Sequence, residues 1–258
     1  MDLASVAGVV LAVAGILGGL MFEGGSIAQV TQPTAMMIVL GGTLGAVMLQ
    51  FPMNIFLAAG KQILRVFFAR AENGEAVVGQ LVEFAVKARK GGILRLDDEL
   101  PAVEDPFLRQ ALMLAIDGTE PAAVRQIMQL ELDNKAEYEE RMSQVFESAG
   151  GFSPTVGIIG AVLGLIQVMQ HLDNINEVGR GIAVAFVATI YGVGLANLVF
   201  LPAAGKLRIR REQEQMVKEM MLEGVISIQE GMNPRMLEIK LRTYLFDGKA
   251  MDAEVVPG

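Results

Sequence analysis

Charged side chains gather in one short stretch of this chain, AVKARKGGILRLDDELP at residues 85–101. Two adjacent cations and, beyond a Gly-Gly break, three consecutive acids make up the motif: Arg89, Lys90, Asp97, Asp98 and Glu99. No metal-ligand or phosphate-binding pattern surrounds them. Their chemistry is either ion pairing with a charged partner or solvation of a helix end whose dipole attracts cations. The residues alone leave both interpretations open.

The chain lacks the residue types of most enzymatic and metal sites. It has no cysteine, no tryptophan and a single histidine, His171. Disulfides, thiolate metal sites and multi-histidine sites are therefore excluded. No nucleophile–base pair or phosphate loop is visible, and the net charge of −8 argues against nucleic acid as a partner. We expect neither an enzyme nor a protein with a bound metal or cofactor.

The composition indicates an integral membrane protein. Of the 258 residues 52% are hydrophobic, and the mean hydropathy is +0.45. Four stretches are apolar enough for a transmembrane helix, which needs about 20 residues. They are Leu3–Phe22, Pro33–Phe51, 148–172 and Gly181–Leu201. The first has no basic region before it, so we interpret it as a retained membrane helix and not as a signal peptide.

The positive charges predict the orientation of these spans. Of 21 Lys and Arg, eleven lie in 52–147 and nine in 202–258, and only Arg180 lies in the two short loops. By the positive-inside rule both long segments and both termini are cytoplasmic. We therefore expect four parts: transmembrane helices 1 and 2 (1–52), a cytoplasmic helical domain (53–147), transmembrane helices 3 and 4 (148–202), and cytoplasmic C-terminal helices with a tail (203–258).

The cytoplasmic segments read as helices with recognisable ends, and the fold class is all-α. Residues 54–69 predict an amphipathic helix at the membrane surface. Asn73 is a cap for a helix over 74–90 that stops at Gly91, and Asp105-Pro106 opens another. The run from 121 to 147 predicts a long helix that continues into the third span.

The spans contain no ionisable residue at membrane depth. An ion pathway usually needs an intramembrane carboxylate. Either the chain carries no ion, or a partner supplies the acid. Four polar side chains do lie inside the spans: Thr43, Gln167, Thr189 and Asn197. Such groups commonly bond to their own helix backbone or to a neighbouring helix.

Small residues and two prolines shape the spans. Pairs of small residues four apart predict close helix packing: Gly15 and Gly19, Gly41 and Gly45, Gly160 and Gly164, Ala188 and Gly192. Pro154 lies inside an apolar run, where it favours a kink, whereas Pro202 is compatible with a kink or with simple helix termination.

Four stretches together resemble the MotA/PomA family of flagellar motor stator subunits: ARKGGILRLDDEL, PTVGIIGAVLGL, AVAFVATIYGVGLANLVFLPAAGKL and EGVISIQEGMNPR. The resemblance covers essentially the whole chain. It implies a multi-pass protein of the bacterial inner membrane, assembled as a homopentamer in membrane lipid. The implied partners are a MotB/PomB-type single-span, peptidoglycan-binding subunit that carries the ion-binding aspartate, and the switch-complex protein of the rotor.

The resemblance also implies residue roles. The rotor-facing positions are Arg89, Lys90 and Asp97, with Asp98 and Glu99 adding charge. At Asp97 the family usually has Glu. Thr189 matches the ion-path threonine, and Pro154 and Pro202 match the prolines that couple ion passage to movement. Sodium-type members carry a threonine where this chain has Ala161, so we expect H⁺ rather than Na⁺ to be transported.

Two alternatives stay open. One is a TolQ/ExbB-like energiser of envelope transport, a more distant kinship whose members usually have three spans and lack the NPR pattern of the tail. The other is a scaffold without a channel, whose spans only anchor cytoplasmic helices. The identity of a periplasmic partner would distinguish the energiser from a stator subunit. An ion-flux measurement would distinguish the scaffold from a channel.

Overall fold

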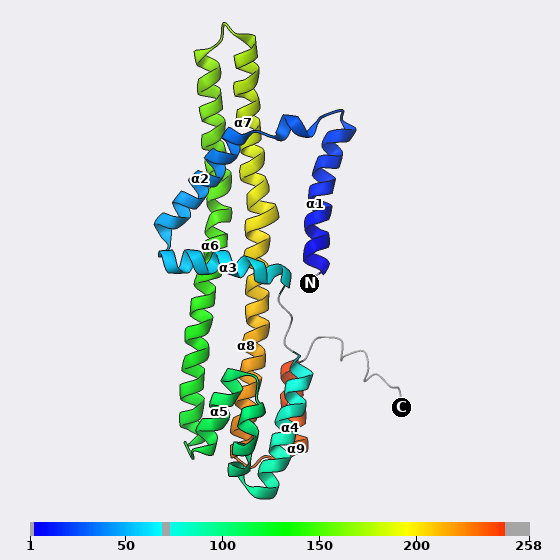
Figure 1. Cartoon of the computed structure of the whole chain (residues 1–258), viewed down its shortest axis with the longest axis vertical. Helices are drawn as coiled ribbons and strands as arrows, with labels where there is room; N and C mark the ends of the chain where they lie inside the picture. The colour runs from blue at the N-terminus through cyan, green and yellow to red at the C-terminus, as the bar shows by residue number, and fades with distance from the viewer. Residues whose placement is uncertain (1–2, 69–72, 246–258) are drawn as a thin grey trace. The chain divides into compact units, whose positions relative to one another are not determined.

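A computed structural model of the chain describes residues 3–68 and 73–245, and within these ranges the regular elements are all helices (Figure 1). The chain divides into two compact units. The spanning unit comprises 1–70 and 139–209, and the polar unit comprises 71–138 and 210–258. Four helical stretches are long and apolar enough to cross a membrane, in agreement with the four predicted spans: Ala4–Phe22, Ile27–Gln50, Pro121–Gln170 and Ile175–Gln229.

The spanning unit contains the apolar helices. Its elements are α1 (Leu3–Phe22), a 3-10 turn (Ile27–Val30), α2 (Pro33–Gln50), α3 (Met53–Phe68), the second part of α6 (Pro121–Gln170), α7 (Ile175–Leu195), a π-helical turn (Ala196–Phe200) and the start of α8 (Leu201–Gln229). As predicted, α6 is one continuous helix of 50 residues. The fourth span begins earlier than expected, because Asn174 caps α7 by accepting a bond from the backbone N–H of Asn176.

Helices α6 and α7 approach each other backbone to backbone. A Cβ atom added to Gly192 would lie 2.6 Å from the carbonyl oxygen of Ser153, and one added to Gly164 would lie 2.7 Å from that of Gly181. The two small-residue pairs predicted on these helices therefore pack as expected. The pairs on α1 and α2 have no such contact within the described chain, since a Cβ on any of the four glycines would meet nothing within 4 Å: Gly15, Gly19, Gly41 and Gly45. Their close packing stays a prediction.

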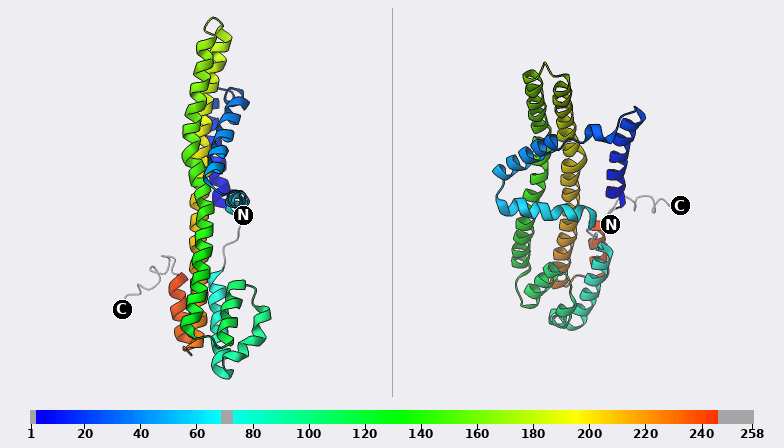
Figure 2. Two further views of the ribbon diagram at one scale, coloured as in Figure 1. Left: turned by 90° about the vertical axis from the view of Figure 1, so that its left-hand side faces the viewer. Right: turned by 45° about the horizontal axis from the view of Figure 1, so that its top comes forward.

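Helix α2 covers one face of the α6–α7 pair (Figure 2, left). Its buried residues recur every four positions, as an α-helical contact stripe requires: Ala35, Val39, Thr43 and Val47. The Tyr191 hydroxyl fixes the start of this helix, because it donates to the carbonyl of Val30 at 2.5 Å and accepts from the backbone N–H of Gln32 at 3.2 Å. These bonds tie α7 to the segment that precedes α2.

The helix continues through Pro202, so the interpretation that this proline ends the helix is wrong. Leu195 ends α7, a π-helical turn covers Ala196–Phe200, and α8 starts at Leu201 without a break. A proline removes the N–H that would bond four residues back. A π-helical turn directly before it shifts the hydrogen-bond register by one residue, which accommodates the missing donor. Pro154 likewise lies inside α6 and does not end it.

The glycine contact between α6 and α7 predicts a matched pair of outcomes. Gly192→Ala places a methyl group against backbone atoms of Ser153 and Gly157, which cannot move aside as a flexible side chain would. We expect a loss of about 1–3 kcal/mol in stability, measured by thermal unfolding of the purified protein. Gly194→Ala is the control, because a Cβ there meets nothing within 4 Å. Equal melting temperatures for the two variants would contradict the contact.

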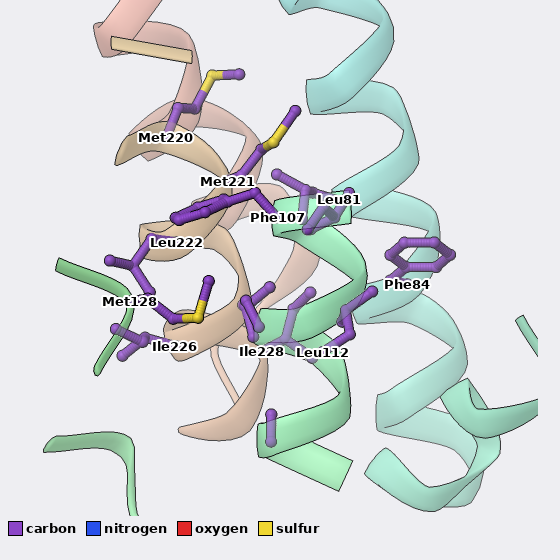
Figure 3. Close-up of a cluster of buried hydrophobic side chains, with 14 of the residues drawn as sticks. Leu81, Phe84, Phe107, Leu112, Met128, Met220, Met221, Leu222, Ile226 and Ile228 are labelled. Atoms are coloured by element: carbon purple, nitrogen blue, oxygen red, sulfur yellow. The ribbon is translucent and has the colours of Figure 1, made fainter. Parts of the chain in front are cut away.

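The polar unit is built around one hydrophobic core (Figure 3). Its elements are α4 (Gly74–Gly91), the 3-10 segment η2 (Ile93–Ala102), α5 (Pro106–Ile116), the first part of α6, the second part of α8, α9 (Pro234–Arg242) and a 3-10 turn (Thr243–Leu245). Side chains from α4, α5, α6 and α8 converge on this core, among them Leu81, Leu112, Met128 and Ile226. Buried Leu237 and Leu241 attach α9 to it.

Asp105 joins local and tertiary structure in this unit. As predicted it caps α5, since its Oδ1 accepts from the backbone N–H of Leu108 at 2.9 Å. Its other oxygen pairs with the ammonium of Lys218 on α8, whose side chain is only 7% exposed. Burial by itself would raise the pKa of the Asp105 carboxyl, but the bonds from Lys218 and Leu108 outweigh it and hold that pKa below its usual range.

Removal of this carboxylate is expected to loosen the polar unit. Asp105→Ala loses the cap and takes one partner from a buried ammonium, so we expect a cost of about 2–3 kcal/mol. Amide hydrogen exchange of α5 and α8 measures it. Asp117→Ala, at an exposed residue just after the same helix, is the control. Unchanged exchange in Asp105→Ala would contradict this contribution.

The same carboxylate gives a pH dependence of defined sign. Because the pKa of Asp105 is lower in the folded than in the unfolded state, its contribution is complete above the unfolded value of about 3.9 and is lost as pH falls below it. The exchange difference between the natural protein and Asp105→Ala should therefore persist at neutral pH and shrink in acid.

Candidate functional site

The charge motif lies at the end of α4 and along η2. The helix includes Gly91 and stops at Gly92, one residue later than predicted, where φ is 83° and ψ is 163°. Only glycine adopts such angles readily. The cations of the motif occupy the last turn of α4, where the helix dipole favours positive charge. Both interpretations of the motif are therefore compatible with this position.

The three acids of the motif differ in their surroundings. Asp97 and Asp98 are exposed, whereas the Glu99 side chain is 31% exposed and its Oε1 lies 2.7 Å from the Nζ of Lys87. Lys87 also lies 2.8 Å from Glu83, and the hydrogen bonds to these two carboxylates raise its pKa. Glu99 is thus engaged within the chain, and the outward-facing acids are Asp97 and Asp98.

Among the described residues the outward-facing charges have no counter-charge of their own. Arg89 and Lys90 are exposed, as are Asp97 and Asp98, and within the described ranges none of the four forms an ion pair. Cations at the end of α4 and acids on η2 therefore display both signs of charge within one short stretch of the chain. Such an arrangement can bind a partner that presents the opposite signs, and its contacts would be sensitive to salt.

The two residues assigned to the ion path, Ala161 and Thr189, lie on one side of the α6–α7 pair. Gly160 faces Ala188, since a Cβ on the glycine would lie 2.8 Å from the Ala188 methyl. Ala161 and Thr189 are the next residues on these helices, and each is rotated by about 100° about the axis of its helix. Because the helices are antiparallel, both turns lead to the same side of the pair.

This side is opposite to the one that α2 covers. Val187 packs with Ala35 and Val39 of α2. Thr189 lies two positions later, about 200° around the helix, so it points away from α2. Around Thr189 the open side is apolar, with Phe186 69% exposed and Val193 also exposed. The Thr189 hydroxyl donates to the carbonyl of Ala185 at 3.2 Å, which leaves its oxygen lone pairs available to accept.

The remaining predicted residues lie on α6, on α8 and in the loop that follows α6. Pro154 is half-buried within α6, and Pro202 is exposed just after the π-helical turn. His171 is exposed and its Nδ1 lies 3.0 Å from the carbonyl of Gln167. Among the described residues no group of three or more His, Asp and Glu side chains could hold a metal ion.

Three features of the structure were not predicted from the sequence. The Lys87–Glu99 pair spans the Gly-Gly break, so helical spacing did not reveal it. Thr43 and Ser153 are fully buried in the spanning unit, and no described residue forms a hydrogen bond with either hydroxyl. Tyr191 bonds to residues about 160 positions earlier, a distance that no local pattern encodes.

Known proteins resemble this chain over almost its full length. The MotA/TolQ/ExbB proton channel family matches residues 99–220, and the motility protein A N-terminal family matches residues 6–92. Motility protein A from Bacillus subtilis is 35% identical over 249 residues, which are 95% of this chain and 91% of that protein. Chemotaxis protein PomA from Vibrio alginolyticus is 33% identical over 249 residues, 96% of this chain and 97% of that protein.

A solved structure has the same fold. A chain in the structure of C. jejuni MotAB superposes with a TM-score of 0.91 at 32% identity, covering 95% of this chain and 96% of that chain. The likeness therefore extends across both units and is not confined to the spans.

Proposed function

The chain belongs to the MotA/PomA stator group of the MotA/TolQ/ExbB proton channel family, and from this membership we propose how it works as an ion-channel subunit of the flagellar motor. It is a multi-pass membrane protein and not an enzyme. The observation that carries the proposal is the combination of an open apolar face bearing Thr189 with a two-signed charge display at Arg89, Lys90, Asp97 and Asp98.

The partner in the membrane is a MotB-type subunit with one transmembrane helix and a peptidoglycan-binding domain. The related C. jejuni structure is of MotAB. The spans of this chain lack a carboxylate, and a partner helix that covers the open face would bring its acid beside Thr189. Five copies of the chain around two partner helices would enclose the pathway. The side of α6–α7 opposite α2 suits this role because its apolar side chains, such as Phe186 and Val193, are exposed.

The transported ion is H⁺ rather than Na⁺. A dehydrated Na⁺ needs several oxygen ligands, whereas a proton can be carried by one carboxylate. Ala161 leaves Thr189 as the only hydroxyl where α6 and α7 flank this face at the same level. A single hydroxyl and a partner carboxylate suit proton transfer better than coordination of a metal ion.

The polar unit transmits the work to the rotor. One charge that crosses the membrane releases about 2.3 kcal/mol per 100 mV, whereas an exposed ion pair is worth about 0.2–1 kcal/mol. A single ion passage can therefore release one surface contact and allow the next to form. Pro154 and Pro202, which lie within continuous helical stretches, are where ion passage would alter helix geometry.

The chain lies in the bacterial inner membrane with both termini in the cytoplasm. The distribution of Lys and Arg supports this orientation by the positive-inside rule. It places the polar unit, and with it the charge motif, on the side where the rotor's switch-complex protein is found. A TolQ/ExbB-like energiser is less well supported, because residues 6–92 match the N-terminal family of motility protein A.

Charge reversal tests the contact with the rotor. Arg89→Glu and Asp97→Lys replace exposed side chains without ion pairs in the described ranges, so the complex should still assemble. Each lost contact should weaken engagement of the rotor about two- to five-fold. Swimming speed and the torque of tethered cells measure it. Glu131→Lys, an exposed reversal on α6, is the control, and normal swimming of both test variants would remove the rotor role.

Ion flux tests the role of Thr189. Thr189→Val keeps the shape and removes the hydroxyl, and we expect proton flux through the complex with its partner to fall about ten-fold or more. Vesicles containing the assembled complex and a pH-sensitive dye give the measurement. Thr189→Ser keeps the hydroxyl and is the control. Equal flux in the valine variant would exclude Thr189 from the pathway.

A further inference from the structure

The 3-10 segment η2 is held in an unusual conformation by contacts at four points. It runs for 10 residues, Ile93–Ala102, whereas 3-10 helices longer than about 3–4 residues are uncommon because their hydrogen bonds are poorly aligned. A segment of this length therefore depends on tertiary contacts. It packs against both α4 and α5.

The two ends of η2 are fixed by a glycine turn and by two arginine side chains. At its start Gly92 turns the chain away from α4, and the side chain of Arg95 folds back over Gly91, where a Cβ would lie 2.7 Å from the Arg95 Cγ. At its end the buried residue Val103 has its carbonyl held by the guanidinium of Arg109, whose Nε donates at 3.0 Å. Between these ends the segment has two inward contacts.

The period of η2 decides which side chains face inward. A 3-10 helix has three residues per turn, so residues three apart lie in one column. Ile93, Leu96 and Glu99 share the column whose middle member, Leu96, is fully buried. Glu99 is therefore turned toward α4, where it meets Lys87 at 2.7 Å. The other two columns carry Asp97 and Asp98, and both of these are exposed. Leu100, which follows Asp97 in its column, is half-buried and packs against the core, so that column faces outward only as far as Asp97.

We propose that Lys87 is a positioning residue for the charge display: by binding Glu99 it fastens the middle of η2 to α4 and keeps Asp97 and Asp98 directed outward. Glu99 then serves as the anchor of this clamp and does not itself contact the rotor. Lys87 suits this role because its ammonium is bound by two carboxylates, Glu83 on its own helix and Glu99 on η2. The effect on torque rests on the proposed function, whereas the clamp itself does not.

The first measurement concerns the clamp alone. In the purified complex, Lys87→Met and Glu99→Gln should each make the amides of 93–102 exchange with deuterium about two- to five-fold faster, the range expected for loss of one partly exposed ion pair. Glu83→Gln is the matched control, because it removes the other carboxylate of Lys87 and leaves the bond to η2 intact. Its exchange over 93–102 should equal that of the natural protein.

A charge swap distinguishes positioning from a general loss of stability. In the Glu83→Gln background, where no like charge faces position 87, Lys87→Glu combined with Glu99→Lys should restore slow exchange, whereas either change alone should not. Torque should follow the same order. If Glu99 instead contacts the rotor directly, Glu99→Gln will lower torque without faster exchange, and the swap will not restore torque.

The outcomes separate this inference from the proposed function. Faster exchange that is reversed by the swap, together with normal torque in Arg89→Glu and Asp97→Lys, supports the clamp and overturns the rotor role. Unchanged exchange in Lys87→Met overturns the clamp, whatever the torque. Exchange that increases equally in Glu83→Gln and Lys87→Met also overturns the clamp. The Lys87–Glu99 bond would then protect η2 no more than the Lys87–Glu83 bond does.

Discussion

The spanning unit depends on the direct approach of two helix backbones, α6 and α7. Glycines at 157, 164, 181 and 192 leave room for carbonyl and Cα atoms of the opposite helix. In a membrane there is little hydrophobic gain from bringing apolar helices together, so close van der Waals packing has to supply the affinity. This glycine contact fixes how each helix is rotated about its own axis. As a result, α2 covers one side of the pair and Thr189 lies on the other.

The polar unit relies on a different kind of constraint. Its core is apolar, but the arrangement of its surface depends on a few charged groups that join separate elements. Lys218 and Asp105 connect α8 to the start of α5, and Glu223 accepts from Arg125 of α6 and Lys240 of α9. Each of these pairs joins elements that are far apart in the sequence. The charge display at the end of α4 is presented on a scaffold that is fixed in this way.

These two features suit a protein that converts ion passage into work. A pathway needs a defined polar group on an otherwise apolar face, and a stepping contact needs charges that are exposed and lightly held. In the charge motif, an acid that is paired within the chain lies directly beside two acids that are exposed. Glu99 is paired with Lys87, whereas Asp97 and Asp98 are free of ion pairs in the described part of the chain.

The sequence by itself determined the four spans, the caps at Asn73 and Asp105, the long α6 and the exposed cations, because each follows from hydropathy, local hydrogen bonding or helix period. It could not reveal that the helix continues through Pro202, since a π-helical turn resolves the missing donor only in three dimensions. Nor could it separate three adjacent acids. Only the tertiary structure decided that, because the three-residue period of η2 and the burial of Leu96 turn one acid inward to Lys87 and leave two outside.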